Sequence, residues 1–295
     1  MKNTMKRAIV LVLVLCMVTA LGVTLAACNR KDPSKLYVGL ECAYSPFNYT
    51  QTDDSNGAIQ IKNTNYKDIR GQYANGYDVM IAKRVAEALG KELVIVKCDF
   101  NGLIPALNAG TIDMVIAGMS PTEERLEAID FSDAYYQSNL VIVVRKNSQY
   151  ANATSLADFD GAKIVAQQGT FHNDALQNQG PSYGINPQTP LKDFPAMINA
   201  LQTATGQYDG YIAEEPGAIE NCASNPDFTY VHLTNNTTGF KASDADTAIA
   251  VGVKKGSDLT AKINAALESI TQAEREDMMK TAIALSSGEN IVEEE

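Results

Sequence analysis

Short apolar runs that alternate with helical segments constrain this chain more than any other feature of its sequence. Residues 36–40, 93–96 and 114–117 have the length and apolar character of buried strands. Between them, residues 78–89 carry apolar side chains on one helical face, and residues 102–109 are also predicted to be helical. Strand–helix–strand units form parallel sheets with helices on both faces, so the pattern predicts an α/β fold.

Three local signals refine this first cycle of strands and helices. Asp78 is expected to cap the first helix. Ser120 and Glu123 have the spacing of a capping box, with Pro121 at the first helical position, and predict the start of another helix. Residues 50–75 are polar and rich in Asn, Gly and Asp, so we expect a long surface excursion there.

A second cycle starts with a long apolar run at residues 140–144. Further strands are predicted at residues 162–166, 211–212, 228–233 and 247–253. Helices are predicted at residues 171–179, 195–203 and 216–222, and an amphipathic helix is expected after Ser257. The length of 295 residues suits one large domain or two of roughly 100–150 residues, and the two cycles favour two.

One internal similarity links the two cycles. Segments 110–117 and 206–213 each follow a predicted helix, and each has a Gly turn and an Asp that leads into a buried strand. The shared residues are Gly110, Asp113, Ile116 and Ala117 in the first segment and Gly206, Asp209, Ile212 and Ala213 in the second. Polar groups follow both strands, with Ser120 and Arg125 after the first and Glu214 after the second. Because ligands bind beyond the carboxyl ends of strands in open sheets, we expect two halves of one cleft.

The balance of charge excludes some classes of function. The chain has 24 basic and 35 acidic residues, a net charge of −11, and without residues 1–27 the count is 21 against 35, or −14. Nucleic acids and anionic membrane surfaces are bound by basic patches. The longest run of like charge here is the acidic one at residues 293–295. We therefore expect no nucleic-acid partner.

The N-terminal segment, residues 1–27, has the features of a secretion signal. Three basic residues precede an apolar run at residues 8–18 that is too short for a stable membrane span. Small residues then lead to Cys28, an arrangement that resembles the bacterial lipobox, in which the cysteine is lipidated and becomes the new N-terminus. We expect residues 28–35 to tether an extracytoplasmic protein, anchored to the cell membrane by lipid at Cys28. The alternative is an uncleaved N-terminal anchor.

Three cysteines, Cys42, Cys98 and Cys222, remain in the predicted fold. Their spacing fits no zinc pattern, and the chain has only two histidines, His172 and His232, so we expect no metal centre and no cofactor. Cys42 and Cys98 each end a predicted strand, which leaves a disulfide between them geometrically possible. Cys222 is expected to be a small buried apolar residue.

Several motifs follow one another in a consistent order over residues 36–285. The most specific is Gly110-x-x-Asp113-x-x-x-Ala117-Gly118-Met119-Ser120-x-Thr122-x-x-Arg125, followed by Ile129-Asp130-Phe131-Ser132. The others are Glu41-Cys-Ala-Tyr44-Ser-Pro46-Phe47, Gly76-Tyr77-Asp78-Val79, Asp99-Phe100-Asn-Gly102-Leu103, Gln168-Gly169-Thr170 and Asp209-Gly-Tyr-Ile-Ala-Glu214-x-Pro216. In this order they resemble the amino-acid-binding proteins of ABC importers, family 3 of the bacterial extracellular solute-binding proteins. Met80, where an acidic residue is frequent, and the length of segment 50–75 depart from the family pattern.

The resemblance implies a two-lobed type II periplasmic-binding-protein fold, with a mostly parallel sheet flanked by helices in each lobe and a two-segment hinge. Residues 36–140 and 244–290 would form lobe 1, and residues 141–243 would form lobe 2. A free amino acid would be captured between closing lobes and delivered to a membrane permease with its ATPase. The protein is expected to be a monomer.

The resemblance also implies roles for single residues, and these suit an amino acid, which carries a carboxylate and an ammonium on one carbon. Arg125 would bind the carboxylate through two parallel hydrogen bonds. The groups that would assist it are Ser120 and the backbone around Gly118, Met119, Gly169, Thr170 and Phe171. Glu214 would bind the ammonium from the other lobe. Tyr44 and Phe100 would hold the ligand side chain between them.

Some of these assignments have alternatives. Arg125 could instead be an ordinary helix-face arginine, and the two aromatic residues could belong to the core. Glu215 competes with Glu214 for the ammonium, although alignment to the family places Glu214 first. Glu41 either pairs with a cationic ligand side chain or caps local backbone. His172 is expected to face solvent rather than the ligand.

The identity of the ligand is less constrained than its class. Glu41 and Glu214 would make the pocket electronegative, which favours lysine, arginine or another cationic amino acid, with glutamine or another neutral polar amino acid as the alternative. An enzyme on the same fold, such as a dehydratase, would need an acid–base pair or an activated nucleophile, and no motif supplies one. A sensory module would need a spanning helix and a signalling domain, and neither is predicted.

Overall fold

The computed structural model describes residues 31–288. The folded body belongs to the unit Ser34–Glu295, and Met1–Pro33 form a separate unit. The signal segment and the lipid attachment at Cys28 lie outside the described residues and stay predictions. Within residues 31–288, no helix combines the length and the apolar character needed to cross a membrane.

The first sheet has eight strands in the order β2-β4-β3-β5-β1-β6-β13-β7. Its parallel centre consists of β1 (Lys35–Leu40), β3 (Ile59–Lys62), β5 (Glu92–Lys97) and β6 (Met114–Val115). Antiparallel strands complete both edges, namely β2 (Tyr49–Gln51), β4 (Asp68–Asn75), β7 (Ile129–Gln137) and β13 (Ala248–Lys254). The sheet is therefore mixed, where the sequence predicted a mostly parallel one.

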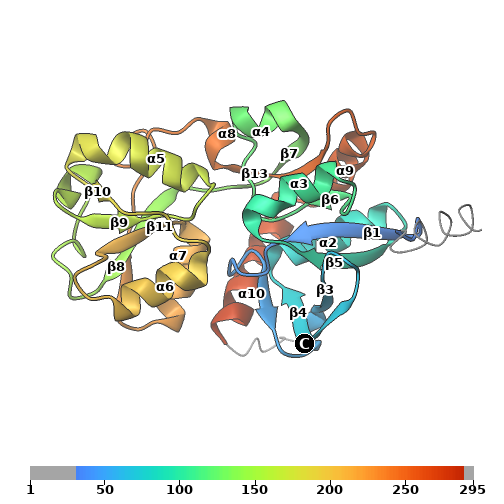
Figure 1. Cartoon of the computed structure of the whole chain (residues 1–295), viewed down its shortest axis with the longest axis horizontal. Helices are drawn as coiled ribbons and strands as arrows, with labels where there is room; N and C mark the ends of the chain where they lie inside the picture. Colours follow the sequence, from blue (N-terminus) through green and yellow to red (C-terminus); the bar gives the residue numbers. More distant parts are fainter. Residues whose placement is uncertain (1–30, 289–295) are drawn as a thin grey trace, which may run out of the picture. The chain divides into compact units, whose positions relative to one another are not determined.

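The helices α2 (Tyr77–Ala88), α3 (Leu103–Asn108), α4 (Glu123–Ala128), α9 (Leu259–Glu268) and α10 (Gln272–Ser287) accompany this sheet (Figure 1), and the single-turn helix α8 (Asp244–Thr247) leads into β13. The apolar face of α2, which includes Ile81 and Val85, is fully buried against β4, β5 and the helices α9 and α10. The C-terminal helices thus pack on the first sheet and on α2. α10 also packs against α7 (Glu215–Ser224), which follows a strand of the second sheet.

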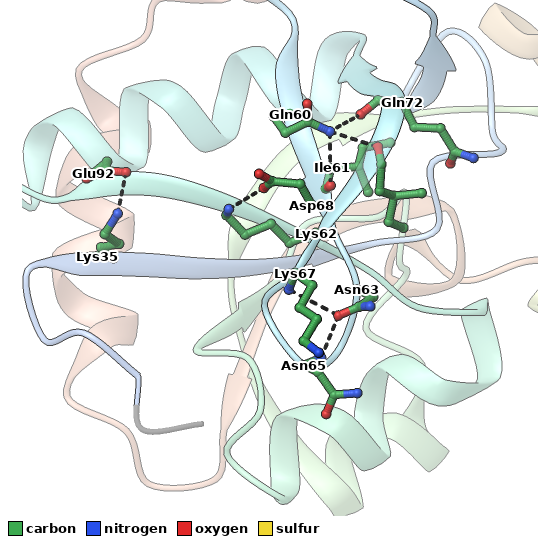
Figure 2. A network of polar contacts seen from close by, with 11 residues as sticks. Lys35, Gln60, Ile61, Lys62, Asn63, Asn65, Lys67, Asp68, Gln72 and Glu92 are labelled. Carbon is green, nitrogen blue, oxygen red and sulfur yellow. Dashed lines mark hydrogen bonds and ion pairs between the residues drawn. The ribbon is translucent and has the colours of Figure 1, made fainter. Parts of the chain in front are cut away.

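Residues 50–75 form strands instead of the expected surface excursion. Ile61 of β3 pairs with Ile95 of β5, and its side chain is fully buried. Gln60 Nε2 donates to two backbone carbonyls of β4 at 2.9 Å each (Figure 2). In the turn between these strands, Asn63 Oδ1 accepts hydrogen bonds from two backbone N–H groups (Figure 2). The polar composition of the segment therefore reflects its exposed face and its turn, and it concealed the alternating pattern of a strand.

The second sheet has five strands in the order β10-β9-β11-β8-β12. These are β8 (Leu140–Arg145), β9 (Lys163–Val165), β10 (Asn186–Pro187), β11 (Gly210–Glu214) and β12 (Phe228–Val231). β9, β10 and β11 are parallel, whereas β8 runs antiparallel to both of its neighbours. Figure 1 shows α5 (Phe171–Gln179), α6 (Phe194–Thr203) and α7 around this sheet.

The chain passes from the first sheet to the second between β7 and β8 and returns between β12 and β13. The two passages lie side by side, because the N–H of Ser138 donates to the carbonyl of Thr247 at 3.1 Å. Alternate residues of β8 serve different cores: Val143 joins the large apolar cluster that includes the first sheet, and Ile142 joins a smaller cluster of the second. The lobe boundaries at residues 140 and 244 stay a prediction.

The internal similarity of the sequence corresponds to a repeated structure. Asp113 Oδ2 accepts from the N–H of Tyr37 at 2.9 Å, and the N–H of Asp113 donates to the carbonyl of Tyr37 at 2.7 Å. Asp209 makes the same pair of hydrogen bonds with Lys163, both at 2.8 Å. In each case the aspartate ties the start of a strand to the parallel strand beside it, β6 to β1 and β11 to β9.

Asp78 was expected to cap α2, but it does not. The helix begins after Gly76, whose φ of 118° suits only glycine, and Asp78 lies in the first turn with its side chain buried. Its carboxyl accepts hydrogen bonds from Asn48 Nδ2 and Tyr135 Oη, each at 2.7 Å. Burial raises the pKa of Asp78 to about 7. This residue therefore connects the first turn of α2 to β7 and to the segment that precedes β2.

Cys42, Cys98 and Cys222 are free cysteines, so no disulfide joins Cys42 to Cys98 in residues 31–288. Cys42 and Cys98 are buried in the large core. Cys222, expected to be a small buried apolar residue, is half-buried and packs against that core.

Candidate functional site

A pocket lies beyond the carboxyl ends of strands from both sheets. It is lined by Tyr44, Phe100, Gly118, Ser120, Arg125, Gln167, Thr170, Phe171, His172, Phe194 and Glu214. Residues up to Arg125 follow strands of the first sheet, and the others belong to segments of the second. Three of the predicted site residues, Glu41, Met119 and Gly169, do not line it.

Arg125 lies in the short helix α4 and is held by backbone oxygens of two loops, one that follows β6 of the first sheet and one that follows β9 of the second. Its Nη1 donates to the carbonyl of Ser120 at 2.8 Å, and its Nη2 donates to the carbonyl of Gly169 at 3.0 Å. Its Cζ lies 5.2 Å from the centre of the Phe100 ring, a cation–π distance. Burial lowers the pKa of Arg125 to about 10, which leaves it cationic at neutral pH.

The start of α4 differs from the predicted capping box. Thr122 is the N-cap, and its hydroxyl oxygen accepts from the N–H of Arg125 at 3.4 Å. Ser120 lies two residues earlier, is buried and lines the pocket. The cap therefore orients the first turn of the helix, and Ser120 remains available to the pocket.

Gly118 admits an aromatic side chain to the pocket floor. Its φ is +59°, and a Cβ at this position would lie only 2.8 Å from the Tyr44 ring. Tyr44 stacks on Phe194, the first residue of α6, with ring centres 4.3 Å apart, and on Phe47 at 4.9 Å. Met119, the next residue, is buried in the first core, so it does not contact the pocket.

Thr170 and its neighbours form the beginning of α5. Thr170 is the N-cap of the helix, and its hydroxyl donates to the carbonyl of Gln167 at 2.7 Å. Gly169 precedes it with a φ of +73°, and a Cβ there would clash with the Asn101 side chain at 2.0 Å. Gly169 thus allows close contact between the two sheets' segments, and Thr170 and Phe171 line the pocket.

Glu214 ends β11 and is buried at the pocket, paired with His172. His172 Nε2 lies 2.9 Å from Glu214 Oε1, and the exposed fractions of the two side chains are 8% and 6%. Burial raises the pKa of Glu214 to about 8, and burial together with the Arg125 cation lowers the pKa of His172 to about 3. The competing carboxylate, Glu215, pairs with His232 at 2.8 Å and does not line the pocket.

Glu41 is buried next to the pocket rather than in its wall. Gln167 Nε2, from the second sheet's segment, donates to Glu41 Oε1 at 2.9 Å and to the carbonyl of Lys192 at 3.2 Å. Burial raises the pKa of Glu41 to about 7. A second contact between the same segments joins Lys192 to Asp99 at 2.9 Å. Glu41 therefore contacts a neighbouring side chain that itself lines the pocket.

Residues 31–288 contain no cluster of three or more side chains that could hold a metal ion. The pocket instead offers one guanidinium, two carboxyl groups in or beside it, three phenylalanines and one tyrosine. Such a set can bind a small molecule with charges of both signs.

Comparison with known proteins agrees with this chemistry. The model of the bacterial extracellular solute-binding proteins, family 3, matches residues 36–281. The chain belongs to this family. Its members are solute-binding transport proteins and not enzymes, and this chain is the substrate-binding protein of an amino-acid ABC transporter.

Relatives of this solute-binding protein include several arginine-binding ones. The arginine-binding extracellular protein ArtP of Bacillus subtilis is 30% identical over 273 residues, which cover 90% of this chain and 93% of ArtP. The structure of AbpA from Streptococcus pneumoniae bound to L-arginine has a TM-score of 0.70 and 26% identity, covering 87% of this chain and 97% of AbpA. An ancestral arginine-binding protein bound to glutamine has a TM-score of 0.65 and 28% identity, covering 85% and 98%. These neighbours share the type II periplasmic-binding-protein fold that the sequence predicted.

Three residues line the pocket of this solute-binding protein although the sequence did not nominate them: Gln167, His172 and Phe194. The expectation that His172 faces solvent was wrong, because it is 6% exposed and turned towards Glu214. Gln167 directly precedes the quoted Gln168-Gly169-Thr170 motif, so that motif could have been extended by one residue. Phe194 follows a helix-capping Asp193 and gave no signal of its own.

Proposed function

We propose that this protein captures a cationic amino acid, with arginine favoured, between its two sheets and delivers it to a membrane permease and its ATPase. The observation that carries the proposal is the pairing of Arg125 and Glu214 as lining residues of one pocket on elements of different sheets. An amino acid presents a carboxylate and an ammonium to a single site. A guanidinium from one sheet and a carboxylate from the other match these two groups.

Arg125 would bind the ligand's carboxylate. Its guanidinium offers N–H groups in a planar fork that fits a carboxylate, and two of its nitrogens are already fixed by backbone carbonyls. Ser120, Gly118 and Thr170 border the same pocket. The Thr170 N-cap also places the start of α5 there, where backbone N–H groups favour an anion.

The ligand side chain would lie among Tyr44, Phe100 and Phe194, whose apolar rings line the pocket. Glu41 lies next to this space with its carboxyl bound to Gln167. A buried carboxyl is stabilised in its charged form by a nearby cation, so a guanidinium or ammonium on the ligand would suit it. Glutamine is the alternative, favoured by the glutamine-bound neighbour, because Gln167 and Glu41 can also bond an amide.

Closure of the two halves of the protein around the pocket would be coupled to ligand binding, since segments that follow the two sheets contact each other there. Arg125 donates to Gly169, Gln167 donates to Glu41, and Lys192 pairs with Asp99. A zwitterion bound to Arg125 and Glu214 would add two more links across the same boundary. The protein would work outside the cytoplasm as a monomer, tethered by lipid at Cys28.

A calorimetric panel with L-arginine, L-lysine, L-histidine and L-glutamine tests the proposal. We expect L-arginine to bind most tightly and L-glutamine more weakly. Tighter binding of L-glutamine than of both L-arginine and L-lysine would replace the cationic assignment by the alternative. If none of the four amino acids gives a heat of binding, the assignment of this pocket as an amino-acid site would be wrong. Mass spectrometry of the lipid-extracted protein from its native membrane tests the acylation of Cys28.

A further inference from the structure

His172 is the polar pocket residue to which the proposed function gives no role. It comes from the first turn of α5, whereas its partner Glu214 comes from the end of β11, so the contact joins two separate elements. Both side chains are more than nine-tenths buried. A contact of 2.9 Å at this depth between two ionisable groups in a ligand pocket can orient both of them.

The surroundings keep His172 neutral. Burial and the Arg125 cation lower its pKa to about 3, and its place in the first turn of a helix also disfavours a cation. The other charged groups near the pair have their own partners, since Glu215 of α7 bonds His232 and Glu41 bonds Gln167. A neutral imidazole has one donor and one acceptor nitrogen.

The unpartnered atoms of the pair indicate which nitrogen carries the proton. His172 Nδ1 and Glu214 Oε2 are buried and have no hydrogen-bond partner within residues 31–288. A buried N–H donor without an acceptor is destabilising. If the proton is on Nε2, this nitrogen donates to Glu214 Oε1 and Nδ1 presents only a lone pair. The opposite tautomer would bury an unsatisfied Nδ1–H.

We propose that His172 is a positioning residue for the ligand's ammonium: its Nε2–H donates to Oε1 of ionised Glu214 and leaves Oε2 of that carboxylate for the ligand. This inference rests on the proposed function and extends it to a residue outside the charge pair. Glu214 binds the ammonium directly, and His172 acts through Glu214. With the ligand's ammonium bound beside it, Glu214 would be ionised, and the Nε2–H of His172 would be a second group that favours the charged form of this carboxyl.

Nitrogen NMR of the full-length protein with labelled histidine tests the tautomer without any substitution at the site. The chain has two histidines, so the variant His232→Gln assigns the remaining signals to His172. In the presence of saturating L-arginine, we expect a neutral ring with the proton on Nε2 throughout pH 5 to 8. A cationic ring, or a proton on Nδ1, would overturn the proposal. If calorimetry detects no amino acid, the proposed function fails as well, whereas binding with the wrong tautomer removes only the role of His172.

Two variants separate the hydrogen bond from the bulk of the ring. His172→Gln retains a donor to Glu214, and His172→Leu does not. We expect His172→Leu to weaken L-arginine binding at pH 7 by about tenfold or more, and His172→Gln by no more than about threefold. The pH at which affinity is highest should rise in His172→Leu alone, because Glu214 loses the donor that favours its charged form. Equal affinities of the two variants for L-arginine would overturn the proposal. If His172→Leu does not fold, the tautomer of His172 in the wild-type protein, measured by NMR, tests the proposal by itself.

Discussion

Segments 110–117 and 206–213 have the same backbone role but are followed by opposite charges. In each, an aspartate bonds the N–H and the carbonyl of one residue in the adjacent parallel strand, with distances of 2.7–2.9 Å. Beyond the first strand lies Arg125, and at the end of the second lies Glu214. The repeat therefore fixes the position of a strand end and leaves the chemistry at that end free to differ.

The two strand ends also differ in how completely their charges are satisfied. Arg125 donates to carbonyls of Ser120 and Gly169, so its guanidinium is held from both sides. One oxygen of Glu214 lies 2.9 Å from His172 Nε2, and its other oxygen has no partner in the described part of the chain. We infer that the cationic end is fixed in advance, whereas the pH sensitivity of the site comes from the anionic end.

Removing the fixed cation should have the largest effect. Truncating one partner of a buried charge pair costs about 2–5 kcal/mol of binding free energy, so Arg125→Ala is expected to weaken L-arginine binding at least about thirtyfold. Arg125→Lys should restore only part of this loss, because an ammonium cannot form two parallel bonds to a carboxylate. Calorimetry at pH 7 measures the dissociation constant of L-arginine for each variant.

Arg84→Ala is the matched control for that substitution. Arg84 pairs with Glu274 at 3.4 Å on the exposed side of α2, away from the pocket lining. Its removal should change affinity by less than about twofold, as is typical of an exposed pair. An Arg125→Ala variant that binds as well as Arg84→Ala would show that the carboxylate is held elsewhere.

Glu214→Gln tests the anionic end through stability. Burial raises the folded-state pKa from the ordinary 4.5 to about 8, so the folded protein holds this proton more tightly than the unfolded chain. That contribution to stability is fully present below pH 4.5 and is lost as the pH rises through about 8. Glutamine cannot ionise, so the Tm of the ligand-free variant should exceed that of wild type at pH 9, by on the order of 5 °C, and match it near pH 4.5.

Glu41→Gln provides the comparison for Glu214→Gln. The pKa of Glu41 is raised to about 7, so its gain in Tm should appear at a lower pH than that of Glu214→Gln. Both variants should weaken L-arginine binding, but only Glu214→Gln should equally weaken L-glutamine binding, since both ligands share the ammonium. A Tm difference independent of pH would contradict the buried-carboxyl assignment.

The repeat itself can be broken at two equivalent positions. Asp113→Ala and Asp209→Ala each remove the acceptor of one backbone N–H at a partly buried strand start, which costs about 1–3 kcal/mol of unfolding free energy. Denaturant titration should give similar losses for both variants, with L-arginine affinity changed by less than about threefold. Unequal losses would show that only one segment depends on its aspartate.

The sequence predicted the parts of this architecture that local patterns encode. The strand beginning at Leu140 and the aspartate repeat follow from apolar runs and local spacing, whereas Arg125 and Glu214, which line the pocket, were nominated through the resemblance to the family. The strand that contains Ile61 was missed because its polar face dominated the composition. The burial of His172 depends on Glu214, more than forty residues later in the chain, and no local pattern encodes such a contact.

Glu215→Gln is expected to have the smallest effect, and it separates two adjacent carboxylates that the sequence alone could rank only by alignment. Glu215 bonds His232, whose side chain is 57% exposed, and an exposed pair contributes about 0–1 kcal/mol. Its L-arginine affinity should therefore stay within about twofold of wild type at every pH from 5 to 9. A loss comparable to that of Glu214→Gln would move the ammonium site one residue along the chain and end the correspondence between the two strand ends.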